Sequence, residues 1–92
     1  MMYATKIKMC TGCESSNHCK DIYSIYIEGA DDERFYLKGV LHDHLKKTPN
    51  SIRVKRGVQP YLVPEESSKG EKYVRSEPND TPYDNLLALP RE

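Results

Sequence analysis

The sequence predicts an α+β domain, in which a small and mainly antiparallel sheet has one helix packed on a face. Three observations support this class. Several short segments alternate apolar with polar residues, which is the period of half-buried strands. One segment in the middle of the chain places its apolar residues at helical spacing instead. The chain of 92 residues is 37% hydrophobic, which supports one modest core, so we expect a single domain over residues 1–92.

Two strands are expected before the helix. Residues 3–9 alternate strictly, and residues 21–28 are rich in β-branched and aromatic side chains, which favour strands. A turn over residues 29–32 ends the second strand, because Gly and Asp readily adopt turn conformations. In the first strand one face carries Tyr3, Thr5, Ile7 and Met9. In the second strand one face carries Tyr23, Ile25 and Ile27, and the other carries Ile22, Ser24 and Tyr26.

The helix is expected between Arg34 and Lys47. Its apolar stripe follows the i, i+3, i+4, i+7, i+8 spacing of one helix face. Acidic residues at the predicted N-terminal end and lysines at the C-terminal end both favour the helix dipole. Gly39 weakens the first half, so the helix can start as late as Leu37, with Phe35 in a short extended segment. The stripe consists of Leu37, Val40, Leu41, His44 and Leu45.

Three further strands are expected after the helix, over residues 52–55, 61–63 and 71–75. The first alternates apolar with basic residues, prolines flank the second, and a Ser-Ser-Lys-Gly turn precedes the third. Residues 84–90 begin with a capping residue and end with a proline, so we expect a short helical turn that lays its leucines on the core. The predicted order is strand, strand, helix, strand, strand, strand, which suits an α+β architecture.

The C-terminal segment KYVRSEPNDTPYDNLLALP, residues 72–90, resembles the closing signature of an uncharacterised bacterial family, domain of unknown function 3892. The signature combines a Tyr-aliphatic-basic-Ser/Thr strand, an acidic turn and an Asp-Asn-Leu-Leu sequence with a nearby Leu-Pro. The resemblance implies no activity, because the family has no assigned chemistry. We interpret the signature as a structural unit of strand, turn and leucine-rich plug. The matching residues are Tyr73, Val74, Arg75, Ser76, Asn79, Asp80, Asp84, Asn85, Leu86, Leu87, Leu89 and Pro90.

Composition and charge disfavour several classes of function. No stretch approaches the ~20 consecutive apolar residues of a membrane helix, and the N-terminal residues do not form a signal-peptide core, so we expect a cytoplasmic protein. The 14 basic and 14 acidic residues cancel. Residues 51–64 carry a net charge of +3 and residues 65–92 a net charge of −3. Three basic residues on one strand fall short of the stripe that nucleic-acid binders show, so nucleic acid is a disfavoured partner.

Three cysteines within ten residues form the sharpest chemical feature of the sequence. Cys10 and Cys13 make a C-x2-C pair, and His18-Cys19 follows. Three thiolates and an imidazole are ligands that zinc prefers, so these four residues are the candidate metal ligands. Adjacent His18 and Cys19 point to opposite sides of an extended chain, which leaves a three-thiol site as one alternative. The other is a set of reduced thiols without metal, because an odd number of cysteines in one short window fits a reducing compartment.

Catalytic chemistry is not expected. His42-Asp43-His44 contains acid–base groups, but positions i and i+2 of a helix point about 200° apart. We expect His44 to be partly buried on the apolar stripe, and His42 and Asp43 to lie in solvent. No nucleophile motif, zinc-protease histidine pair or glycine-rich phosphate loop accompanies them. The protein is therefore expected not to be an enzyme.

Tyrosines dominate the aromatic residues, with 7 against a single Phe. Tyrosine suits interfaces because it combines apolar area with a polar tip. Tyr26 points away from the isoleucines beside it, and the sheet face that it shares with basic residues is a candidate contact surface. These basic residues are Lys6, Lys8, Arg53 and Lys55.

We therefore expect a non-catalytic binding or interaction module, whose partner is another protein or a second copy of the chain. One alternative is a zinc-binding module built on the cysteine cluster, and no other cofactor is expected. Another alternative is a weak nucleic-acid binder that uses the Lys/Arg/Tyr sheet face for stacking.

Overall fold

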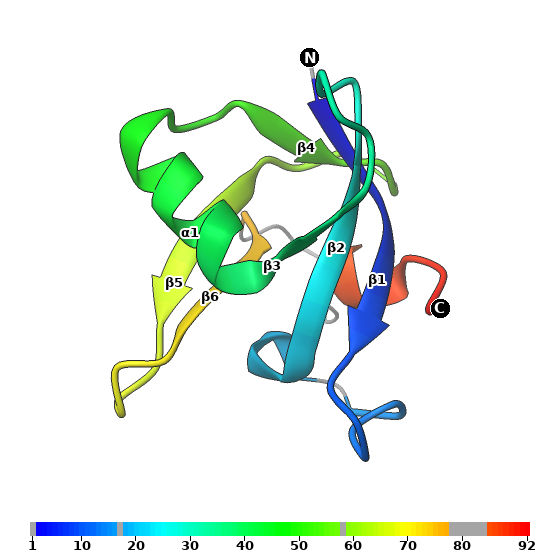
Figure 1. Cartoon of the computed structure of the whole chain (residues 1–92), viewed down its shortest axis with the longest axis vertical. Coiled ribbons are helices and arrows are strands. Elements are labelled where there is room, and N and C mark those ends of the chain that lie inside the picture. The colour runs from blue at the N-terminus through cyan, green and yellow to red at the C-terminus, as the bar shows by residue number, and fades with distance from the viewer. Residues whose placement is uncertain (1, 17, 58, 78–84) are drawn as a thin grey trace.

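The computed structural model describes residues 2–16, 18–57, 59–77 and 85–92. It has an α+β fold, which confirms the predicted class and the predicted order of elements, with one short strand added before the helix (Figure 1). In chain order the elements are β1 (Met2–Met9), the 3-10 turn η1 (Cys19–Asp21), β2 (Ile22–Glu28), β3 (Phe35–Leu37), α1 (Lys38–Lys47), β4 (Ile52–Val54), β5 (Leu62–Glu66), β6 (Lys72–Ser76) and the 3-10 turn η2 (Asn85–Ala88).

The described strands form a four-stranded sheet in the order β3-β2-β1-β4 and a two-stranded sheet of β5 and β6. Pairing is antiparallel except between β1 and β4, which are parallel, so the mainly antiparallel prediction is confirmed. The C-terminal tail pairs with β1 at Ile7, further along the edge of β1 on which β4 pairs with Met2–Ala4. The amide of Ile7 donates to the carbonyl of Pro90 at 2.9 Å, and the amide of Glu92 donates to the carbonyl of Ile7 at 2.9 Å.

A bulge at Thr5 changes which residues of β1 are buried. The strand advances from Ala4 to Lys6 while its partner β2 advances by a single residue, so Thr5 is the extra residue. As a result Ala4, and not Tyr3, shares the buried face with Ile7. The expectation that Tyr3 and Thr5 share one face with Ile7 is therefore wrong for Tyr3, because strict alternation does not continue through a bulge.

A second bulge has the same effect on β2. Lys8 pairs with Ser24 and Met9 pairs with Ile22, which leaves Tyr23 as the extra residue. Ile22 and Ser24 are buried, and Tyr23 is 52% exposed. The prediction that Tyr23 lies on one face with the isoleucines that follow it is wrong for this reason.

The helix begins later than the first predicted boundary and buries a different stripe. Residues 35–37 pair with β2 as β3, so α1 begins at Lys38, one residue after the latest start that Gly39 suggests. Leu37 is 48% exposed and Val40 is 53% exposed, so their assignment to the buried stripe is wrong. The helix contacts the hairpin of β5 and β6 as well as the larger sheet. Because of these contacts with the hairpin, the buried side of the helix differs from the predicted stripe. The buried helix residues are Leu41, His42 and Leu45.

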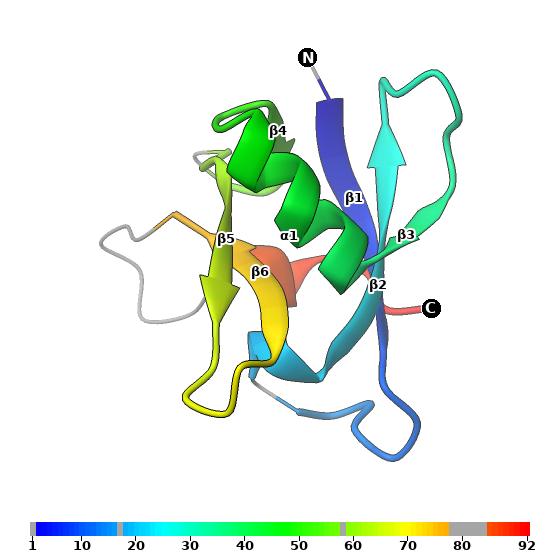
Figure 2. The ribbon, with the colours of Figure 1, turned by 60° about the vertical axis from the view of Figure 1, so that its left-hand side comes forward.

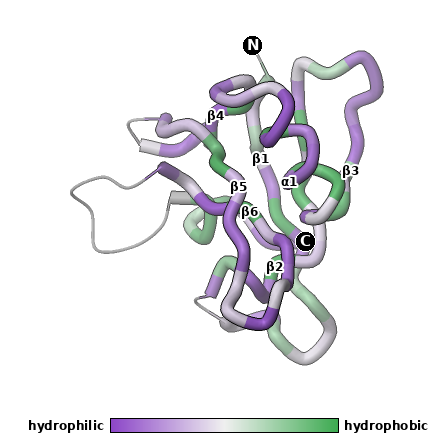
Figure 3. Tube along the Cα trace, turned by 90° about the vertical axis from the view of Figure 1, so that its left-hand side faces the viewer, coloured by the Kyte–Doolittle hydropathy of each residue, from purple (hydrophilic) through white to green (hydrophobic). Residues whose placement is uncertain are grey.

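The core lies between the larger sheet on one side and α1, the β5–β6 hairpin and η2 on the other. Figures 1 and 2 both show α1 and the hairpin on the same side of β1 and β2. Hydrophilic residues follow the turn between β5 and β6, which lies away from this core (Figure 3). Leu86 and Leu89 of the tail are buried in the core, which confirms the predicted leucine plug, whereas its expected cap, Asp84, lies outside the described residues.

No helix in the described part of the chain is both long enough and apolar enough to cross a lipid bilayer.

Candidate functional site

The outer face of the larger sheet is the surface opposite the core. The strand register places two rows of side chains across it. Phe35, Tyr26 and Lys6 are neighbours on three successive strands, because Tyr26 pairs with both of the others. In the second row Tyr3 pairs with Glu28 on one side and Arg53 on the other, and Arg53 pairs with Tyr61. We define the outer face as Tyr3, Lys6, Lys8, Tyr26, Phe35, Arg53, Lys55 and Tyr61.

Each aromatic ring of the outer face has a cation near it. Such cation–ring contacts are attractive because the ring carries negative charge on its faces. Tyr26 and Phe35 also contact each other edge to face, with ring centroids 5.3 Å apart at 79°. The cation-to-centroid distances are 5.1 Å for Lys6 and Tyr26, 5.8 Å for Lys8 and Phe35, 5.7 Å for Lys55 and Tyr3, and 4.4 Å for Arg53 and Tyr61.

The four cations of the outer face differ in how firmly they are held. Arg53 donates to the carbonyl of Gln59 at 3.0 Å and to the hydroxyl of Tyr61 at 3.1 Å, so its guanidinium is fixed. The Nζ of Lys6 lies 3.5 Å from Oε1 of Glu92, and the two side chains are 43% and 49% exposed, so solvent screens the ion pair and it contributes little. Lys8 and Lys55 are exposed and form no ion pair with any residue that the structure describes.

The cysteine loop does not gather the candidate zinc ligands. Gly12 has a φ of 84° in the turn that joins Cys10 to Cys13, and the amide of Cys13 donates to the carbonyl of Cys10 at 2.9 Å. His18 is exposed, whereas Cys19 packs against the core. Within the described ranges no three His, Cys, Asp or Glu side chains are placed to hold a metal ion. Zinc binding therefore stays a prediction, and it requires these side chains to move.

The environment of Cys13 favours the thiol over the thiolate. Partial burial raises the pKa of the Cys13 thiol, and the nearby charges of Asp21, Cys10 and Glu14 raise it further. Reactive and redox-active cysteines instead need a lowered pKa. None of the three cysteines is in a disulfide, and all three are half-buried.

The His42-Asp43-His44 segment is divided between three environments. His42 is only 2% exposed, and its Nδ1 donates to the carbonyl of Tyr73 at 3.1 Å. The expectation that His42 lies in solvent is wrong, because β6 covers this side of the helix. Asp43 is exposed, as predicted, and its Oδ1 lies 3.2 Å from Nζ of Lys72. His44 is half-buried, as predicted, with its Nε2 3.2 Å from the Ser51 hydroxyl.

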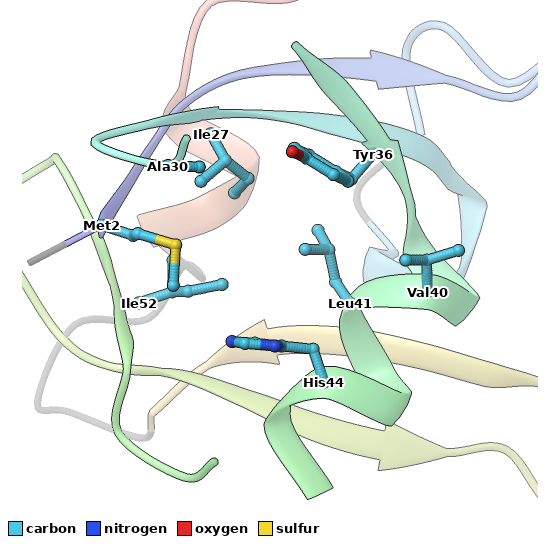
Figure 4. A pocket seen from close by; sticks show the side chains of 8 residues that line it. All are labelled: Met2, Ile27, Ala30, Tyr36, Val40, Leu41, His44 and Ile52. Atoms are coloured by element: carbon cyan, nitrogen blue, oxygen red, sulfur yellow. The ribbon is translucent and has the colours of Figure 1, made fainter. Parts of the chain in front are cut away.

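A small apolar pocket lies on the core side of the sheet, between α1 and the first residues of β1 and β4 (Figure 4). Its volume is about 150 Å³, enough for one small ring. His44 points into the pocket, and its imidazole and the phenol of Tyr36 are the two ionisable groups among the lining residues. The lining therefore offers shape and apolar contact, and no carboxylate to work with the imidazole. The lining residues are Met2, Ile27, Ala30, Tyr36, Val40, Leu41, His44 and Ile52.

Sequence reasoning found the cations of the outer face but missed most of its rings. Tyr3 was assigned to the buried side by alternation, and the bulge at Thr5 reverses it. Phe35 and Tyr61 join the face because they pair with Tyr26 and Arg53 of neighbouring strands, a pairing that the pattern within one strand does not indicate. The available signal was the excess of Tyr in predicted strands, which indicated exposed rings without locating them.

The fold and the outer face define a small α+β domain whose larger sheet has one side on the core and a second side that no described helix or strand covers. The chain belongs to the family described as "Protein of unknown function (DUF3892)", whose model matches residues 26–90. This confirms the family indicated by residues 72–90 and extends the match back to β2, with the cysteine loop and β1 outside the matched residues. Neither a curated protein nor a solved structure gives a significant match.

Proposed function

We propose that this protein is a non-catalytic binding module that holds an anionic partner on its outer face. The observation that carries the proposal is the pairing of four aromatic rings with four cations on one open sheet surface. An open antiparallel sheet normally covers its solvent side with mixed polar residues. Here that side combines half-buried rings, which are enriched at interfaces, with three lysines and an arginine, which supply the positive charge that an anionic partner requires.

The charge of the outer face supports an anionic partner. Its four cations are opposed by Glu28 in the second row and by Glu92 beside Lys6. The surface thus keeps an excess of positive charge although the whole chain has none. Lys8 and Lys55 are the cations most available to a ligand, because both are exposed and their side chains are flexible.

Cation–ring pairs also stabilise a folded sheet, by about 0.5–1 kcal/mol each at exposed sites. That role and ligand binding predict different results when charge is reversed. A stabilising role predicts a loss of fold stability and no change in any binding. A binding role predicts a loss of affinity for anions that depends on where the charge lies.

The test compares two double variants with the same net charge. Lys8→Glu with Lys55→Glu reverses two charges on the outer face, and Lys46→Glu with Lys69→Glu reverses two on α1 and the β5–β6 turn. Binding of inorganic polyphosphate and of a poly-glutamate peptide is measured by isothermal titration calorimetry at low salt. We expect at least a tenfold loss of affinity in the first variant and a much smaller loss in the second. Equal losses, or no binding of either polyanion to the unmodified protein, would contradict the proposal.

A further inference from the structure

We infer that the anionic partner is a single-stranded nucleic acid, whose bases stack on the rings of the outer face while its phosphates contact the lysines. This inference rests on the proposed function and specifies its ligand. Base–aromatic stacking tolerates any sequence because every base has a flat face, and it accompanies a cationic groove or surface in proteins that bind single strands.

The spacing of rings and cations fits a nucleotide. The ammonium groups of Lys6, Lys8 and Lys55 lie 5.1–5.8 Å from the centroids of the rings beside them. A base stacked on such a ring is joined through its sugar to a phosphate a few ångströms from the ring edge. A lysine displaced from the ring face can reach this phosphate, because its four-carbon stem is flexible.

The arrangement of the rings favours unpaired bases. The Tyr26 and Phe35 rings stand at 79° to each other in an edge-to-face contact, so the edge of one ring covers a face of the other, and the ring faces that are left for stacking do not lie in one plane. Bases that dock on both must point in different directions, which a duplex does not allow without opening. Among the described residues, the face also carries no helix that could enter a duplex groove. Single strands, whose bases can splay apart, meet these constraints.

The rings also distinguish a nucleic acid from an acidic peptide. A peptide carboxylate gains from the lysines but not from the rings, and it must displace the cations that now contact them. A nucleotide replaces each cation–ring contact with a base–ring contact and supplies a phosphate to the freed lysine. Tyr61 contributes less, since the fixed guanidinium of Arg53 lies 4.4 Å from its centroid. The predicted stacking positions are therefore Tyr3, Tyr26 and Phe35.

The number of cations limits the affinity and sets its salt dependence. For single strands, log K falls with log salt by about 0.7 for each phosphate neutralised, so the three lysines give a slope of about −2. Binding should consequently be measurable at low salt and weak at physiological salt.

The experiment separates stacking from charge by using two oligonucleotides with the same phosphates. Fluorescein-labelled (dT)12 and an abasic 12-mer are titrated with the protein at low salt, and anisotropy is recorded. We expect (dT)12 to bind at least tenfold more tightly than the abasic strand, since stacking on one ring contributes about tenfold or more in affinity. Tyr26→Leu and Phe35→Leu should lower affinity for (dT)12 and leave that for the abasic strand unchanged. Tyr23→Leu, which removes an exposed ring outside the face, should change neither.

Further arms keep the result interpretable. Tyr26→Phe retains the ring and loses only the hydroxyl that donates to the Glu33 carbonyl, so it should bind (dT)12 as the unmodified protein does. Unchanged binding of the abasic strand by Tyr26→Leu shows that this variant is folded. Equal affinity for (dT)12 and the abasic strand would overturn the inference and leave the proposed function standing. Equal or tighter binding of a duplex, or of the poly-glutamate peptide, would also overturn it. Absence of binding to every anion would contradict both.

Discussion

Replacing Leu86 with alanine should remove a large part of the stability of this protein. Leu86 is 0% exposed in η2, and this turn contacts both β1 and β6, so the buried side chain lies in the part of the tail that meets the larger sheet and the hairpin. Truncation removes three buried carbon atoms, about 0.8 kcal/mol each, and leaves a cavity, for a total of roughly 3–4 kcal/mol. A chain of this length has a free energy of unfolding of about 5–14 kcal/mol, so the loss is a substantial fraction.

The assay is urea denaturation followed by circular dichroism, with thermal unfolding as a second readout. A loss of 3 kcal/mol corresponds to a Tm lower by about 12–24 °C for a domain of this size. Leu87→Ala is the matched control, because Leu87 lies in the same turn and is only half-buried, so its loss should be about 1 kcal/mol. A loss below about 1 kcal/mol for Leu86→Ala, or losses equal in the two variants, would refute the interpretation of the tail as a plug of the core.

Three other predictions concern single side chains. His42→Phe keeps a buried ring but leaves the Tyr73 carbonyl without the imidazole donor. The free energy of unfolding, measured by urea denaturation, should therefore fall by about 1–3 kcal/mol. The control is His44→Phe, at a half-buried position, for which the free energy of unfolding should fall by less than about 1 kcal/mol. Thr5→Val removes a buried hydroxyl that has no partner among the described residues, so it should raise the free energy of unfolding by about 1 kcal/mol; a decrease would show that the hydroxyl is satisfied. In a Cys10→Ser, Cys19→Ser background, the pH profile of Cys13 alkylation by iodoacetamide should have its midpoint above the ordinary cysteine pKa. Asp21→Asn should move that midpoint down, because it removes a negative charge that disfavours the thiolate, and an unchanged profile would contradict the assigned cause.

Local sequence pattern was sufficient for the elements themselves. Alternation located β1 and β2, helical spacing located most of α1, and the capping and proline signals located η2. These patterns depend on residues within one element, where side-chain direction follows directly from the backbone period. The family signature was likewise contained in one continuous segment.

Features that depend on pairing between distant segments could not be predicted. The bulges at Thr5 and Tyr23 exist only because β1 and β2 are matched at unequal lengths, and each one reverses the faces expected from alternation. Gly39 indicated a late helix start and a short extended segment at Phe35, which β3 confirms, but the pairing of residues 35–37 with β2 could not be predicted from this segment alone. His42 is buried because the β5–β6 hairpin packs on α1, which nothing in the helix sequence indicates.

The outer face combines both cases. Its cations and Tyr26 follow from alternation within strands, and they were identified as a candidate contact surface on that basis. Phe35, Tyr61 and Tyr3 depend on cross-strand register, so the density of rings on the face became apparent only in the structure. The density of rings on this face is the reason that we favour an anionic ligand with bases, although the net charge of the chain is zero.

The most direct test of the account is a titration of the 15N-labelled protein with (dT)12 at low salt, followed by two-dimensional NMR. We expect the amide shifts to concentrate on β1, β2 and β3 around Lys6, Tyr26 and Phe35, and added salt to reverse them. Shifts confined to α1 and the apolar pocket beside His44, or no shifts at low salt, would contradict it.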